Sequence, residues 1–160
     1  MGKQLAKRKP VAKAIALKKQ TDVFTMIGLD KFLKPNETNS LKLIDVVRKG
    51  LPIRIINNFG KLFLLSKKEL AHILNLSERT LQRYTPDKLL DKHSTAHTIQ
   101  LAELYEEGVQ LFGNIDKFNM WMNYPSFVFG DKKPIDLIDT PIGIKLVKQQ
   151  IVRIQHGVYS

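Results

Sequence analysis

One stretch constrains the fold of this chain more than any other: residues 65–84, LSKKELAHILNLSERTLQRY. Ser66 is followed three residues later by Glu69, the S-x-x-E pattern in which side chains and backbone cap each other at the start of a helix. Apolar residues then recur at helical spacing on one face: Leu70, Ile73 and Leu74. The stretch is therefore predicted to open with a short amphipathic helix.

A second short helix is predicted after a brief break. Ser77 is its expected N-cap, with Thr80 in place of Glu at the third position. Leu81 and Tyr84 continue the apolar face, and Ala71 in the first helix is small enough for two helices to cross closely. Two capped helices joined by a tight turn are the pattern of a helix-turn-helix.

The outward side chains of the second helix carry the chemistry of base readout. Arg pairs bidentately with guanine, Gln with adenine, and Thr contacts a thymine methyl group or a phosphate. Glu78 fits either a cytosine contact or a favourable charge at a helix start. An ordinary helical hairpin with a polar face is the alternative, but caps, turn and outward chemistry together favour DNA. The predicted DNA-binding residues are Ser77, Arg79, Thr80, Gln82, Arg83, Lys67 and Lys68.

The net charge of +11 at pH 7 is concentrated ahead of this motif. Residues 1–60 hold 13 Lys and Arg against 4 Asp and Glu, residues 61–112 hold 7 against 7, and residues 113–160 hold 6 against 4. A polyanionic partner is the simplest explanation of this excess, with nucleic acid first and an anionic membrane surface second. A basic tail that is merely solvated is the plain alternative.

Composition excludes several classes of protein. The 160 residues, 43% of them hydrophobic, suffice for one ordinary domain or two small ones. No apolar run approaches the ~18 residues of a transmembrane helix, and the basic N-terminus lacks the apolar region of a secretory signal. The absence of cysteine excludes disulfides and thiolate metal sites, and is compatible with a reducing cytoplasm.

The chain ahead of the motif also favours helices. The apolar residues within 21–34 fit a short helix packed on the domain or an oligomer contact, and a polar linker follows to residue 39. Ser40 is expected to cap a helix that ends at Gly50 and faces the core with Leu41, Ile44 and Val47. A helix from there to Gly60 fits best, with an apolar strand as its competitor.

The chain after the motif completes an all-α fold. Ser94 or Thr95 is expected to cap a long helix that ends at Gly113, and Asp116 to cap the next. Residues 126–133 are expected to form a loop with two exposed aromatic residues. Pro134 opens a one-turn helix, and the last helix is capped by Thr140 with Pro141 in its first turn, where a missing N–H costs nothing.

The order of residues in this last segment resembles a known family. It runs Leu111…Gly113, Trp121…Pro125, Gly130, Pro134-Ile135-Asp136-Leu137-Ile138, Thr140-Pro141-Ile142-Gly143, Val147 and Ile151…Gly157. It resembles the C-terminal toxin-binding domain of the Xre/MbcA/ParS antitoxins, and Ser77-Glu78-Arg79-Thr80-Leu81-Gln82-Arg83 is similar to their S-x-R-T-L-x-R recognition helix. The resemblance covers roughly residues 41–157. The loop ahead of Pro134 is longer and more basic than the Gly-Gly turn usual in the family.

The resemblance implies both a function and a division of the chain. Such antitoxins repress their own operon and neutralise a neighbouring toxin that resembles an ADP-ribosyltransferase and acts on NAD, by covering its active site. It implies a Cro/Xre-like helix-turn-helix domain over residues 40–112 and a toxin-binding domain over 113–160. Residues 1–39 lie outside the resemblance and are expected from their composition to be a basic N-terminal segment and linker, partly disordered or in an oligomer contact. The implied toxin contacts are Trp121, Tyr124, Phe127, Phe129, Arg153, Tyr159 and Ser160. Trp, Tyr and Arg are enriched at binding hot spots, although a core role for Trp121 is an equal alternative.

No catalytic or metal site is predicted. His93 and His97 share a helix face, but Ser94 stands where an H-E-x-x-H motif needs Glu, so both are interpreted as solvated. The chain is expected to be a non-enzyme without a cofactor, in the bacterial cytoplasm, with no membrane partner. Its expected partners are a toxin, operator DNA and a second copy, because one helix-turn-helix contacts only a half-site. The alternatives are a stand-alone helix-turn-helix regulator with a C-terminal dimerisation domain, and an RNA- or membrane-surface-binding protein.

Overall fold

The computed structural model describes residues 22–158, so the predictions for residues 1–21, Tyr159 and Ser160 lie outside it. Within these residues the only β structure is two isolated bridges, Pro52 with Leu89 and Ser126 with Lys132. The all-α prediction is confirmed. In chain order the elements are α2 (Val23–Ile27), η1 (Leu29–Lys31), η2 (Pro35–Glu37), α3 (Leu41–Lys49), α4 (Arg54–Leu62), α5 (Lys67–Ile73), α6 (Glu78–Arg83), α7 (Lys92–Phe112), α8 (Ile115–Met122), η3 (Phe127–Phe129), η4 (Pro134–Leu137) and α9 (Pro141–Gln155).

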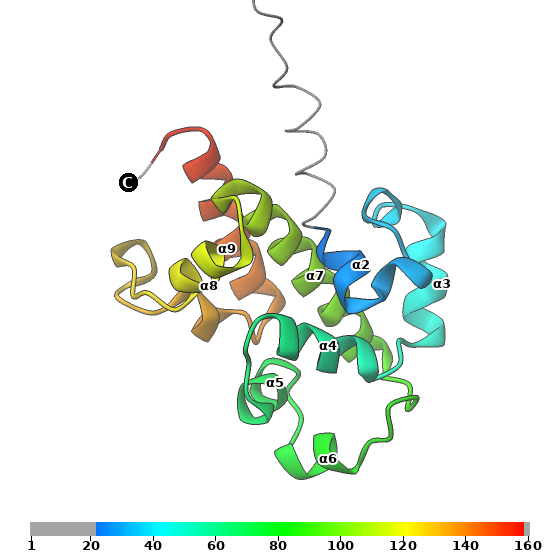
Figure 1. Cartoon of the computed structure of the whole chain (residues 1–160). Coiled ribbons are helices and arrows are strands. Elements are labelled where there is room, and N and C mark those ends of the chain that lie inside the picture. Colours follow the sequence, from blue (N-terminus) through cyan, green and yellow to red (C-terminus); the bar gives the residue numbers. More distant parts are fainter. Residues whose placement is uncertain (1–21, 159–160) are drawn as a thin grey trace, which may run out of the picture.

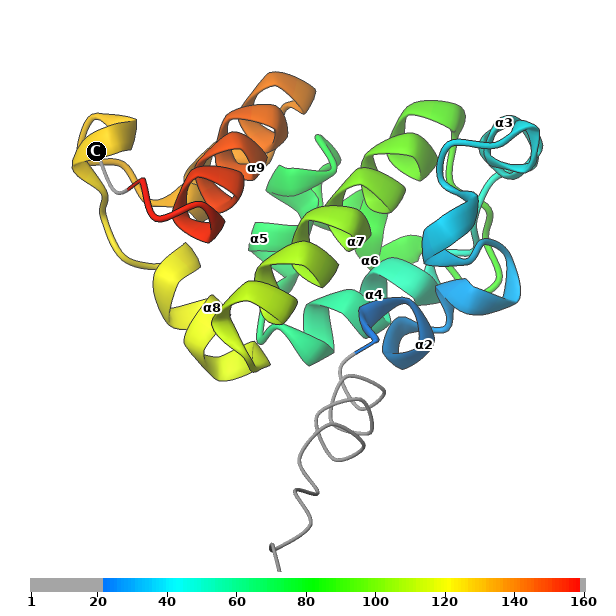
Figure 2. The same cartoon turned by 90° about the horizontal axis from the view of Figure 1, so that it is seen from above.

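Helix α7 lies at the centre of the fold, in contact with α2, α3, α8 and α9 (Figure 1). Viewed from above, α9 lies along one side of α7, while α2 and α3 lie on the other (Figure 2). The residues of α7 that are buried include Ile99, Leu101, Ala102, Leu104, Tyr105 and Val109. One long helix thus supports both the part of the chain before it and the part after it.

The aromatic ring of Tyr105 joins these two parts. It is fully buried and meets Phe59 of α4 edge-on at 4.7 Å between ring centroids, and Phe118 of α8 at 5.0 Å. Phe63, just after α4, lies 4.2 Å from the same ring. Edge-to-face geometry is the favoured arrangement of buried rings. The two parts therefore share one continuous core.

Helix α2 packs onto this core, which is the first of the two alternatives predicted for residues 21–34. Asp22 caps the helix by accepting from the backbone N–H of Phe24 at 3.1 Å. The Val23 N–H donates to Oε2 of Glu106 on α7 at 2.6 Å, and the Asn58 side chain donates to the carbonyl of Ile27 at 3.1 Å. Desolvation by burial raises the pKa of Glu106 above its usual value.

Of the three residues predicted to face the core from α3, Val47 does so and Leu41 and Ile44 do not. Leu41 is 80% exposed and Ile44 is also exposed, while the residues that contact the core are Leu43, Val46 and Val47. Ser40 occupies the N-cap position, but its hydroxyl donates to the Glu37 carbonyl at 2.5 Å and caps nothing. The Ser40 hydroxyl is therefore hydrogen-bonded to the preceding turn, η2, and not to the first turn of α3. Packing of α3 on α7 determines which side of the helix faces the core.

Helix α4 confirms the helix predicted for the segment after Gly50, although not its end. It excludes the strand, and it continues through Gly60 to Leu62. A Cβ on Gly60 would lie 2.4 Å from Cδ1 of Leu70, so this glycine allows α4 and α5 to cross closely. Gly60 therefore marks a helix crossing, not the helix end that the sequence predicted.

Two predicted caps are displaced by residues just ahead of them. Asp91 caps α7 by accepting from the Ser94 N–H at 2.8 Å, and Ser94 and Thr95 lie buried inside the helix. Asn114, not Asp116, caps α8 by accepting from the Lys117 N–H at 2.8 Å. The predictions of a stop at Gly113, a one-turn helix at Pro134 and a Thr140 cap are confirmed.

Candidate functional site

The predicted helix-turn-helix forms as its sequence indicates. Oγ of Ser66 accepts from the Glu69 N–H at 3.2 Å, while Oε2 of Glu69 accepts from the Ser66 N–H at 2.7 Å. Oγ of Ser77 accepts from the Thr80 N–H at 3.0 Å. Asn75 takes the left-handed conformation, φ 53°, which Asn tolerates better than most residues, and so turns the chain between α5 and α6.

Burial divides the side chains of α6 between packing and recognition. Leu81 is buried against the core, whereas Glu78, Arg79, Gln82 and Arg83 are exposed. Lys67 and Lys68, at the start of α5, are exposed too. Thr80 is half-buried, and its hydroxyl and that of Ser77 lie 2.7 Å apart in a hydrogen bond. Ser77 and Thr80 therefore stabilise the start of α6. The side chains free to contact bases are the longer ones, Arg79, Gln82 and Arg83.

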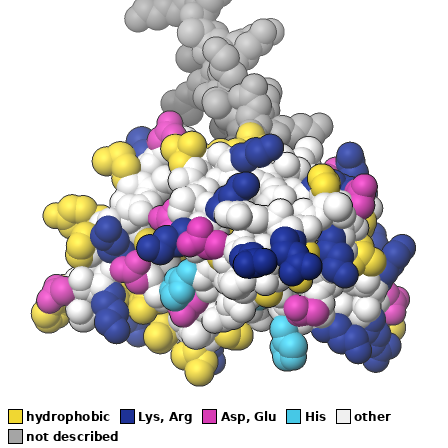
Figure 3. Space-filling view, turned by 90° about the horizontal axis from the view of Figure 1, so that it is seen from below, with side chains coloured by type: hydrophobic (Ala, Val, Ile, Leu, Met, Phe, Trp, Pro, Cys, Tyr) yellow, Lys and Arg dark blue, Asp and Glu magenta, His cyan; other side chains and the backbone are white. Residues whose placement is uncertain are grey.

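Helix α6 lies at the outer edge of the molecule (Figure 1), on the face shown in Figure 3. Lys and Arg side chains are spread across that face, with Asp and Glu among them (Figure 3). Beside α6 a hollow of about 450 Å³ is lined by Thr80, Arg83, Tyr84, Thr85 and Lys88. Nζ of Lys88 lies 5.9 Å from the centre of the Tyr84 ring. Two cations in one hollow next to a recognition helix suit a phosphate.

The sequence did not predict Lys88 as a DNA-binding residue, because its position beside α6 depends on the contacts that hold the loop after α6. The carbonyls of Pro86 and Lys88 accept from the N–H groups of Arg54 and Ile53, at 3.1 and 2.8 Å. The Arg54 side chain forms an ion pair with Asp87. This loop is therefore fixed to the start of α4, and Lys88 is held next to α6.

The other end of the molecule presents aromatic side chains. Trp121 is half-buried; its ring stacks on Phe118 at 5.8 Å and meets Phe112 at 5.4 Å and Phe129 at 6.5 Å. Trp121 thus belongs partly to the core. Phe129, predicted as exposed, is half-buried by that contact.

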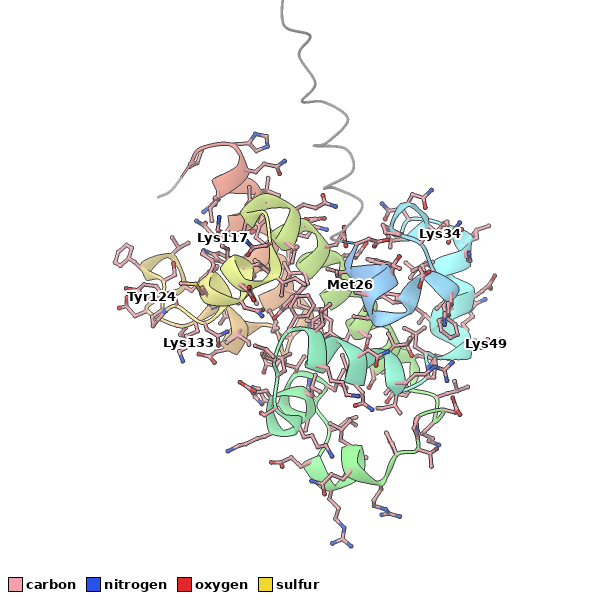
Figure 4. All side chains as sticks on the ribbon, in the orientation of Figure 1. Met26, Lys34, Lys49, Lys117, Tyr124 and Lys133 are labelled. Carbon is pink, nitrogen blue, oxygen red and sulfur yellow. The ribbon has the colours of Figure 1, made fainter. Side chains whose placement is uncertain are left out.

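Tyr124 and Phe127 are the aromatic residues most open to solvent at this end, 75% and 90% exposed. Figure 4 shows Tyr124 projecting outward from the segment after α8. Arg153 is exposed on α9, and it lines a groove of about 350 Å³ together with Phe129. Of the predicted toxin contacts, Phe129 and Arg153 therefore meet at one groove, while Tyr159 and Ser160 lie outside the described residues.

The two ends meet at a joint between the helix-turn-helix and the start of α9. Nδ2 of Asn75 donates to the Asp139 carbonyl at 3.0 Å, and Nε2 of His97 donates to the Ile138 carbonyl at 2.8 Å. Nε2 of His72 lies 3.7 Å from Oδ2 of Asp139. A cavity of about 260 Å³ lies at this joint. The turn that follows α5 is thus hydrogen-bonded directly to the segment that starts α9.

His97 is not the solvated residue that the sequence predicted. It is buried, and desolvation lowers the pKa of its imidazole below the usual value. The neutral ring therefore donates Nε2–H to a backbone carbonyl, a structural role. His93 is exposed. Across residues 22–158 no three His, Cys, Asp or Glu side chains are arranged to hold a metal ion, and no helix is long and apolar enough to cross a membrane.

Comparison with known proteins matches both parts of the chain. Residues 107–157 match the family described as the antitoxin Xre/MbcA/ParS C-terminal toxin-binding domain. Residues 42–103 match the antitoxin Xre-like helix-turn-helix domain. The first match covers the end of α7 with α8 and α9, and the second covers α3 to the middle of α7.

Curated relatives carry similar descriptions. "Antitoxin Xre" of Yersinia enterocolitica is 26% identical over 120 residues, covering 74% of this chain and 81% of the relative. "Antitoxin Xre" of Photorhabdus laumondii is 26% identical over 117 residues, covering 72% and 79%. The "Prs ADP-ribosylating antitoxin" of a Sphingobium species is 26% identical over 127 residues, covering 73% and 80%. In the crystal structure of the Mycobacterium tuberculosis MbcT–MbcA toxin–antitoxin complex, one chain is 22% identical with a TM-score of 0.48, covering 66% of this chain and 94% of that one.

Proposed function

Because the chain belongs to the Xre/MbcA/ParS family of antitoxins, with a helix-turn-helix domain and a C-terminal toxin-binding domain, we propose that it acts at both ends of the fold. The C-terminal end binds a cognate toxin and covers its active site. The α6 end binds operator DNA and represses the chain's own operon. Both activities are binding, not catalysis, and we place them in the bacterial cytoplasm.

One observation carries the toxin-binding half of this proposal. Within the toxin-binding match, Tyr124 and Phe127 are 75% and 90% exposed, whereas Phe118 and Trp121 of the same match stack in a packed aromatic cluster. Exposed aromatic side chains next to a rigid support are typical of protein-binding hot spots. The Tyr124 N–H donates to the Trp121 carbonyl at 3.2 Å, which ties this segment to the helix that carries the stacked rings of Trp121 and Phe118.

The target of the toxin is proposed to be NAD. The name of the Sphingobium relative refers to ADP-ribosylation, a reaction whose donor is NAD. A toxin of that chemistry either transfers ADP-ribose or hydrolyses NAD. An antitoxin that covers the active site blocks both reactions, because neither NAD nor a target can then enter.

The DNA-binding half rests on the exposed side chains of α6. Arg79, Gln82 and Arg83 have the donor patterns that read guanine and adenine in a major groove. One such helix contacts a single half-site, so operator binding is proposed to require two copies of the chain. These copies are further proposed to assemble with toxin into a hetero-oligomer.

The toxin-binding proposal is tested by pairing two exposed-residue variants. Y124A/F127A is expected to lose protection of cells against the toxin and to keep operator binding. L41A, which removes a side chain of similar exposure from α3, is the matched control for toxin binding and is expected to protect as the wild type does. Full protection by Y124A/F127A would contradict the proposed surface. Operator binding by a chain that protects against no neighbouring toxin would favour a stand-alone regulator.

A further inference from the structure

Gln150 of α9 is an unusual residue in this fold because it is buried without being satisfied. Its side chain is only 5% exposed, and its Oε1 has no hydrogen-bond partner among residues 22–158. Buried side-chain acceptors almost always have a partner, because an unmade hydrogen bond inside a protein is costly. A buried amide that lacks one is a reason to look for a group that arrives from outside.

Gln150 lines the groove of about 350 Å³ between α9 and the loop after α8. The groove has an apolar part and a polar part, and its lining comprises Val128, Phe129, Leu137, Leu146, Gln149, Gln150, Lys132 and Arg153. The last torsion of a Gln side chain is soft and roughly two-fold, so the carboxamide can turn its oxygen or its nitrogen toward the groove. A partner that enters the groove can therefore supply the missing donor.

The charged side chains of the groove indicate which other groups the partner carries besides the hydrogen-bond donor for Gln150. Lys132 and Arg153 are both exposed, and neither forms an ion pair with an acid of the described chain. No Asp or Glu lines the groove, although Asp131 and Asp136 lie close by in the sequence. The backbone positions Lys132, because its carbonyl accepts from the Ser126 N–H at 3.1 Å. Two cations around an apolar pocket suit a carboxylate beside an apolar side chain.

We propose that this groove is the specificity pocket for the toxin, and that its occupant is a toxin segment carrying an Asp or Glu next to an apolar residue. The carboxylate meets Lys132 and Arg153, the apolar side chain lies on Phe129 and Leu146, and a backbone N–H of the segment donates to Oε1 of Gln150. The inference rests on the proposed toxin-binding function and adds the chemistry of the partner.

The role of Gln150 is tested by Q150M, which keeps the length of the side chain and removes its hydrogen-bonding groups. The melting temperature of the free chain is expected to rise, because a buried acceptor without a partner is gone. The affinity for the purified toxin is expected to fall at least tenfold. A higher melting temperature together with a lower toxin affinity would show that Gln150 serves toxin recognition and not the stability of the fold. Unchanged toxin affinity, or a loss of stability together with affinity, would overturn the assignment.

The charges are tested by K132E/R153E against K117E/K145E, a control with the same change in net charge at exposed positions outside the groove. The groove variant is expected to lose at least tenfold more toxin affinity than the control, and to bind operator DNA as the control does. Equal losses in both would mean that only long-range charge acts and would overturn the proposal. A groove variant that loses operator affinity but keeps toxin affinity would overturn it in favour of nucleic acid. If the wild-type chain binds no toxin, the proposed function itself fails, a result distinct from any of these.

Discussion

The contact between Gly108 of α7 and Phe118 of α8 offers a sharp test of how the toxin-binding end is held in place. A Cβ on Gly108 would lie 2.2 Å from two carbons of the Phe118 ring. That ring has little freedom to move, because Tyr105 meets it edge-on at 5.0 Å and Trp121 stacks on it at 5.8 Å. G108A is therefore expected to displace α8, and Trp121 with it.

The size of the effect follows from two opposing contributions to the free energy of unfolding. Overpacking a core costs about 1–3 kcal/mol, and Ala recovers about 1 kcal/mol relative to Gly inside a helix. Because the new methyl group would lie 2.2 Å from two ring carbons, we take the cost from the upper part of that range, about 2–3 kcal/mol. The net loss is then roughly 1–2 kcal/mol, which for a chain of this length lowers the melting temperature by roughly 2–8 °C. Toxin affinity is expected to fall as well, because Trp121 moves.

The assay combines calorimetry with separate titrations of toxin and operator DNA. G108A is expected to keep operator affinity, since α6 packs on α5. A second substitution, F118L, makes room for the new methyl group, so G108A is expected to cost less stability in the F118L background than in the wild type. A G108A chain that melts and binds toxin as the wild type does would refute the reasoning. So would equal costs in both backgrounds.

Three further predictions follow from other parts of the fold. R79A is expected to weaken operator binding about tenfold or more, since a bidentate base contact is worth about 1–3 kcal/mol; titration of K61A is the control, and toxin affinity measured in parallel should not change. The lowered pKa of His97 means that its contribution to stability is present above the unfolded value of 6.5 and is lost as the pH falls through the folded pKa. Urea unfolding from pH 7.5 to pH 5 is expected to show that loss in the wild type and less of it in H97Q; identical profiles would contradict the assignment. Truncation after Gln155 removes no buried residue of α9, whereas truncation after Gln150 also removes buried Ile151. The chain that ends at Gln155 lacks the predicted toxin contacts Tyr159 and Ser160. It is expected to bind operator DNA and to lose protection against the toxin, which a growth assay with induced toxin checks.

The features that the sequence predicted well depend on short stretches of chain. Ser66 with Glu69, Ser77 with Thr80, and Thr140 with Gly143 each make their cap within three residues. Such contacts need no information about the rest of the fold. The helix-turn-helix and the last helix were predictable for that reason, as was the outward face of α6.

The features that the sequence missed depend on distant packing. Leu41 and Ile44 have helical spacing, but packing on α7 turns them outward. His97 becomes a buried donor only because the Ile138 carbonyl, far along the chain, comes to meet it. Gly60 reads as a helix stop until Leu70 is placed against it.

The candidate site also has one part that local sequence predicts and one part that depends on distant packing. Exposure of Arg79 and Arg83 follows from the local helix pattern, whereas the groove at Gln150 requires η3, η4 and α9 to come together. No local motif marks Gln150, because a glutamine on a helix is ordinarily a solvated residue. Its role emerges only from its burial in the folded chain.

The most direct test of the account uses the open reading frame next to the gene for this chain. That frame is induced alone and then together with this chain, while growth and cellular NAD are followed. We predict growth arrest when it is induced alone and recovery of growth when the two are expressed together. Loss of NAD during the arrest identifies a toxin that hydrolyses NAD, and an unchanged NAD level identifies one that transfers ADP-ribose. Growth that is unaffected by the neighbouring product, or an arrest that this chain does not relieve, would contradict it.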